Sequence, residues 1–67
     1  MHSRLAGTVK WFDNRHGMGV IKAEGRAWNY LVLRCATQNG ELLTGQRVWF
    51  EPITKGLANW AFNVVRQ

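Results

Sequence analysis

The feature that most constrains this fold is a succession of short apolar runs, each ended by turn residues, with no helical periodicity between them. These runs and the turn residues that divide them predict β-strands at residues 5–12, 18–23, 30–35, 47–50 and 60–65. An open sheet of such strands would leave backbone groups unpaired at its edges, whereas closure removes the edges. The 67 residues therefore predict one domain, residues 1–67, of the all-β class: a closed or nearly closed five-stranded antiparallel barrel.

Alternation along the strands also separates inner from outer side chains. The predicted interior positions are Val9, Ile21, Val48, Phe50, Phe62 and Val64. The predicted outward positions are Lys10, Met18, Val20, Lys22, Arg47 and Trp49. Trp60 shares its alternation with the last interior positions and is expected in the core.

Pro52 and two glycines add local predictions. Pro52 is expected to end the fourth strand, because it has no N–H to donate to a ladder. Gly17 and Gly19 flank Met18 and leave room for the close approach of another backbone or ring.

The excess of basic over acidic residues indicates what kind of molecule the chain could bind. Nine Lys and Arg residues face four acids, for a net charge of +5, and the cations are spread along the chain. Such a spread suits a folded face of positive potential, and it equally suits a basic solvated surface. The chain lacks the amphipathic helical repeat that binding to a membrane surface would need.

Composition argues against catalysis and cofactors. A single cysteine, Cys35, excludes an intrachain disulfide framework and a Cys-based zinc site. Two histidines and scattered acids define no metal site, and no spacing orients a nucleophile and base. We therefore expect no enzyme and no cofactor. The lone thiol and the absence of a signal peptide or a membrane-spanning run predict a soluble cytoplasmic protein.

Residues 7–21 place a basic, aromatic strand directly before a glycine-spaced strand. Lys10, Trp11 and Phe12 stand together in the first strand. Cations that meet phosphates and flat rings that meet bases are the elements of a surface for single-stranded nucleic acid. The hairpin therefore predicts binding of single-stranded RNA or DNA.

The same residues resemble a known family. Gly-Thr-Val-Lys-Trp-Phe at residues 7–12, followed by Gly-Met-Gly-Val-Ile at 17–21, is similar to the first two strands of bacterial cold-shock domains. Residues 45–50, 55–56 and 61–64 resemble later landmarks of that family in the right order. The resemblance implies an OB-type barrel that binds single-stranded RNA or DNA and can loosen its secondary structure.

Position by position, the resemblance implies that Lys10, Trp11 and Phe12 contact nucleic acid. His16 stands where the family usually has Lys. Met18 and Val20 occupy two positions that are Phe in the family's second strand.

The third strand permits two alignments with the family's Phe, His and Phe positions. Alignment through residues 24–25 puts Tyr30, Val32 and Leu33 there. Alignment through residues 36–38 shifts the register by one and puts Leu31, Leu33 and Arg34 there. The first is preferred, because it turns Leu31 inward and keeps a ring outward at Tyr30.

The predicted nucleic-acid surface combines four cations for phosphates with rings and softer side chains for bases. It consists of Lys10, Trp11, Phe12, Arg15, His16, Met18, Val20, Lys22, Arg26, Tyr30 and Val32. Stacking on an aromatic ring is worth roughly 1–3 kcal/mol per base, so the missing rings predict weak, charge-dominated and largely non-specific binding. The expected role is that of a nucleic-acid chaperone or a regulator of transcription or translation.

A second hypothesis keeps the barrel but gives it a protein partner. Met18, Val20, Val32 and Trp49 would then form an apolar contact, either with a second copy of the chain or with another protein. An exposed Trp is typical of interface hot spots, although it is equally typical of a ring packed over a neighbouring strand.

Overall fold

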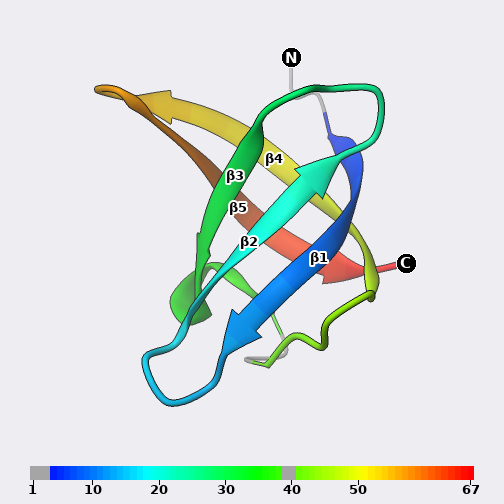
Figure 1. The fold of residues 1–67 in the computed structure, drawn as a ribbon, viewed down its shortest axis with the longest axis vertical. Helices are drawn as coiled ribbons and strands as arrows, with labels where there is room; N and C mark the ends of the chain where they lie inside the picture. The colour runs from blue at the N-terminus through cyan, green and yellow to red at the C-terminus, as the bar shows by residue number, and fades with distance from the viewer. Residues whose placement is uncertain (1–3, 39–40) are drawn as a thin grey trace.

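The strands pair in the order β1-β2-β3-β5-β4, and β4 returns to β1, so that the sheet closes into a barrel (Figure 1). The computed structural model describes residues 4–38 and 41–67. Its elements are β1 (Leu5–Asp13), β2 (Met18–Ala23), β3 (Asn29–Leu33), the 3-10 turn η1 (Arg34–Ala36), β4 (Arg47–Lys55) and β5 (Ala58–Arg66). The predicted five-stranded barrel is confirmed; its strands pair antiparallel, as predicted, except β3 and β5, which pair in parallel. The polar stretch at residues 37–41 predicts a break between the third and fourth strands, and its residues 39–40, like residues 1–3, lie outside the described residues.

Five of the six predicted interior side chains line the barrel. Val9, Ile21, Val48, Phe50 and Val64 are almost completely buried and pack in one apolar cluster. Alternation identified them because a closed barrel gives every strand one dry face.

A β-bulge in β1 decides where the hairpin's ring points. Val9 pairs with Ile21, but the next partners are Trp11 and Val20, so Lys10 is an extra residue on β1. Strict alternation from Val9 would turn Trp11 inward. The bulge instead leaves Lys10 and Trp11 both exposed, the indole at 46%.

Phe62, predicted to be interior, is 38% exposed, and that prediction was wrong. Trp49 pairs with Val65 and Glu51 pairs with Phe62, so β5 carries one residue more than β4 between these partners. Asn63 takes up the extra length with a positive φ of 50°. Alternation is broken there, and Phe62 faces outward.

Trp60 does not lie in the core, as was expected. It is half-buried at the barrel surface, while Val64 lies inside. The bulge at Asn63 again explains the difference. In a regular strand the side chains of Trp60 and Val64 would point to the same face, and the extra residue between them turns them to different faces.

Pro52 does not end the fourth strand. It pairs with Ala61 within β4, which continues to Lys55. Pairing of β1 with β4 ends at Leu5 and Phe50, so the rest of β4 pairs with β5 alone. A residue without an N–H is accommodated in a strand that has one open edge.

The third strand adopts the register that was not preferred. Tyr30 pairs with the interior residue Ile21, and it is only 3% exposed. Its ring packs 5.0 Å from that of Phe50 between centroids, and its hydroxyl accepts a hydrogen bond of 2.8 Å from Trp28 Nε1. The barrel thus buries the ring and satisfies its polar end.

The expected outward direction of Tyr30 and Val32 was therefore wrong, since Val32 is fully buried. Leu31, expected inside, is half-buried on the outer face, and Leu33 is exposed beside it. A shift of one residue exchanges the two faces of a strand, and the pairing with β2 settles which face is inside.

Candidate nucleic-acid interface

The outer face of β1, β2 and β3 carries the hairpin's side chains in two cross-strand rows. Trp11 pairs with Val20, which pairs with Leu31. In the next row Met18 pairs with Leu33. These side chains are exposed or half-buried, so the three strands share one largely apolar outer surface.

Phe12 supports this surface from its edge. It is half-buried against the core, and its ring covers Gly19, its cross-strand partner. A Cβ placed on Gly19 would lie 2.7 Å from Phe12 Cδ1 and 2.4 Å from the carbonyl oxygen of Trp11. The room that the glycine was expected to leave is thus occupied by the chain's own ring and backbone.

Exposed cations flank the two apolar rows along the direction of the strands. Lys10 precedes the indole on β1, Arg15 belongs to the β1–β2 turn beside Met18, and Lys22 lies near the end of β2. A single strand of nucleic acid that crosses the rows would meet positive charge before and after them. This distribution suits contacts with several phosphates.

Arg26, the fourth predicted cation, lies beyond β2 beside a residue that sequence reasoning did not select. Its guanidinium carbon is 5.8 Å from the ring centroid of Trp28, a cation–π distance. Trp28 is exposed and also donates to Tyr30. In the sequence, Trp28 is marked only as an unexplained Trp two residues after a basic residue.

The β1–β2 turn is held by Asp13. The backbone N–H groups of Arg15 and His16 donate to Asp13 Oδ1 at 2.9 and 3.3 Å. His16 Nδ1 lies 2.6 Å from Asp13 Oδ2. His16 is therefore oriented by the turn, and its imidazole is exposed beside Arg15.

These contacts lower the pKa of Asp13 below its ordinary value of 3.8, chiefly through the His16 hydrogen bond, with the two backbone N–H groups adding to it and desolvation opposing it. Because the folded pKa is the lower one, ionised Asp13 adds stability that is complete above about pH 4 and is lost as the pH falls through the folded pKa. We expect an NMR titration of the carboxyl carbon to give a midpoint below 3.8, and His16→Ala to raise it. A wild-type midpoint at or above 3.8 would contradict this account of the turn.

Arg34 is a second residue that the preferred alignment missed. Its guanidinium donates to the carbonyl oxygen of Asn14, and its backbone N–H donates to that of Gly17 at 2.8 Å. It thereby fastens the β1–β2 turn to η1. The other alignment of the third strand would have selected Arg34 together with Leu31 and Leu33.

The apolar protein contact suggested as an alternative is not formed as one surface. Val32 is buried, and Trp49 pairs with Ala6 near the start of β1, whereas Met18 pairs with Asp13 at its end. Trp49 lies instead beneath Arg4, whose guanidinium carbon is 5.8 Å from the ring centroid.

None of the helices among the described residues, 4–38 and 41–67, has the length and apolar character needed to cross a bilayer. Within the same residues, no three or more His, Cys, Asp or Glu side chains are grouped so that they could hold a metal ion.

Comparison with known proteins identifies relatives over nearly the whole chain. No protein-family model matches the sequence. Cold shock protein CspA of Staphylococcus aureus (strain USA300) is 37% identical over 62 residues, which span 90% of this chain and 94% of the relative. The CspA proteins of Staphylococcus haemolyticus and Staphylococcus saprophyticus match with the same identity and coverage.

Among solved structures, Drosophila Unr CSD456 superposes with a TM-score of 0.84 over 98% of this chain and 27% of that one. Its sequence identity is 16%, so the likeness concerns the fold. The barrel order, the outward Trp11 on the bulged first strand and the identity to the staphylococcal proteins lead to one conclusion. This chain belongs to the cold shock protein family.

Proposed function

We propose that the protein binds single-stranded RNA or DNA across the outer face of β1, β2 and β3. The observation that carries this proposal is the exposed indole of Trp11 beside Lys10, on the same face as the Met18 row. An unpaired base can stack on the indole while its phosphates approach the cations. Membership of the cold shock protein family supports the same reading.

Binding is weak and dominated by charge. Met18, Val20 and Leu33 occupy the outer rows on β2 and β3, so Trp11 on β1 is the exposed ring of these three strands' rows. Each missing ring removes roughly 1–3 kcal/mol of stacking. Met18 recovers part of it, because a thioether is polarizable and packs well against flat rings.

Weak, non-specific binding suits a chaperone of nucleic acid. A protein that binds unpaired strands and not duplexes shifts the equilibrium toward the open form by mass action. Charge-driven binding releases readily, which lets a strand be held open and then passed to transcription or translation.

Quenching of Trp fluorescence on titration with an oligonucleotide tests the proposal. If Lys10, Arg15, Lys22 and Arg26 each meet a phosphate, log K should fall with log salt at a slope of about −2.8. A fourfold rise in salt should then weaken binding about 50-fold. The absence of salt-sensitive quenching at low ionic strength would refute the proposal.

Inorganic polyphosphate of comparable charge serves as the control. It should compete for the cations without quenching the Trp fluorescence, because it offers no base to stack. A duplex of the same sequence should bind more weakly than the single strand, since its bases are already stacked.

A further inference from the structure

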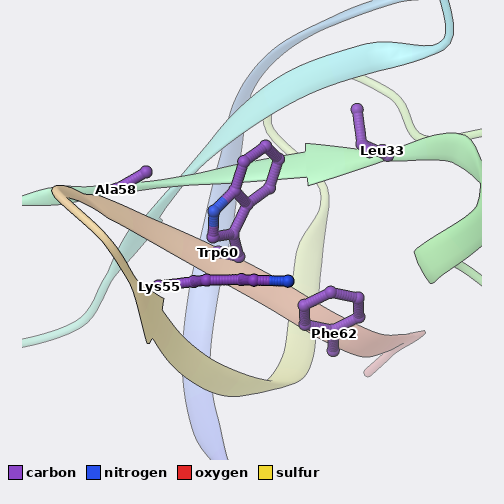
Figure 2. Close-up of a pocket in the computed structure, with 5 residues that line it drawn as sticks. All are labelled: Leu33, Lys55, Ala58, Trp60 and Phe62. Carbon is purple, nitrogen blue, oxygen red and sulfur yellow. The ribbon is translucent and has the colours of Figure 1, made fainter.

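A pocket of about 430 Å³ opens beside the interface, on the face where β3 meets β5. It is lined by Leu33, Lys55, Ala58, Trp60 and Phe62 (Figure 2). Leu33 belongs both to the pocket and to the Met18 row. The pocket therefore adjoins the surface proposed for nucleic acid.

The cross-strand pairing continues the interface into this pocket. Leu31, the last member of the Trp11 row, pairs in parallel with Trp60 on β5. The indoles of Trp11 and Trp60 thus lie at opposite ends of one row that crosses β1, β2, β3 and β5. Three strand spacings separate them, about 14 Å along the sheet.

Two rings are available in the pocket. The bulge at Asn63 turns Phe62 outward, two residues from Trp60 on the same strand. Lys55 extends along the pocket with its Nζ end directed toward Phe62 (Figure 2). Aromatic walls beside an ammonium group match the two chemical parts of a nucleotide, a flat base and a phosphate.

We propose that this pocket is an additional base-binding subsite, occupied by a nucleobase of the strand that crosses β1 to β3, with Lys55 on its phosphate. The inference rests on the proposed function. Continuity with the cationic surface and the charge of Lys55 favour an anionic strand over an apolar peptide. The subsite supplies stacking on β5, since β2 and β3 carry no ring on their outer face.

The test compares oligothymidylates of about four and about eight nucleotides, within the site sizes that OB folds accommodate. Trp60→Leu removes the ring and keeps apolar bulk. We expect it to weaken binding of the longer strand about 5- to 50-fold and to leave the shorter one within about twofold. Trp49→Leu makes the same change outside the proposed path and should alter neither affinity.

The outcomes separate this inference from the proposed function. If wild type binds neither strand, both fail. If Trp11→Ala weakens binding while Trp60→Leu leaves both affinities unchanged, or lowers both equally, the subsite alone is overturned.

Should Trp60→Leu fail to fold, two other measurements apply. Phe62→Leu should also weaken the longer strand selectively. In the wild-type protein, the Trp60 indole N–H resonance should move on titration with the longer strand and stay in place with the shorter one. An unmoved resonance at saturation with the longer strand would overturn the subsite.

Discussion

Gly19→Ala is expected to destabilise the protein by about 3 kcal/mol, at the upper end of the usual cost of overpacking. The added Cβ would lie 2.4 Å from the Trp11 carbonyl oxygen and 2.9 Å from Phe12 Cα, so backbone atoms of β1 would have to move. Chemical denaturation measures the loss. Because the displaced residues adjoin the bulge that exposes Trp11, binding of single strands should weaken as well.

Gly25→Ala provides the matched control for this prediction. Gly25 has a φ of +74°, and no atom of the described residues beyond its chain neighbours lies within 4 Å of the place that an alanine methyl group would take. The substitution should cost only the left-handed backbone penalty of roughly 1–2 kcal/mol and leave binding intact. If Gly19→Ala proved no more costly than Gly25→Ala, close packing of β1 over Gly19 would not be the reason for the glycine.

Trp11→Ala is expected to lower affinity for single-stranded oligonucleotides about 5- to 100-fold, the equivalent of one lost stacking interaction. The indole is 46% exposed at the bulge, so its removal takes away the proposed base contact while the core stays closed. Fluorescence anisotropy of a labelled oligonucleotide measures this change without relying on the indole itself. The salt slope should be nearly unchanged, because Lys10 and the other cations remain.

Trp49→Ala tests whether such a loss is specific. Its indole is 40% exposed, much like that of Trp11, but it lies on β4 beside Ala6 and Val65. The affinity of this variant should equal that of the wild type, and Trp11→Phe should keep most of the binding. Equal affinities for Trp11→Ala and wild type would remove the central contact of the proposed interface.

The core and the turns follow largely from sequence. Val9, Ile21, Val48 and Phe50 each have at least one polar neighbour in the chain, and the breaks between strands carry turn residues. These are local signals, since the period of two belongs to the strand itself and turn chemistry belongs to a few adjacent residues. A closed or nearly closed barrel then follows, because closure leaves few strand edges unpaired.

The third strand shows where local signals become ambiguous. Both faces of residues 29–33 are apolar enough to be buried, so alternation alone could not choose between them. Pairing with β2 and the fit of the Tyr30 ring against Phe50 decided it. The consequence is that the outer face carries Leu31 and Leu33 instead of a ring.

By itself, the sequence determined the strand content, the closed barrel, most of its core and the basic, aromatic hairpin. The tertiary structure showed how Trp11, which the resemblance placed on the binding surface, comes to face solvent, and it alone decided that Phe62 faces outward and that Tyr30 does not. The physical reason is that bulges at Lys10 and Asn63 adjust each strand to its neighbours on both sides. Such an adjustment depends on the closure of the whole sheet, and no periodicity within one strand records it.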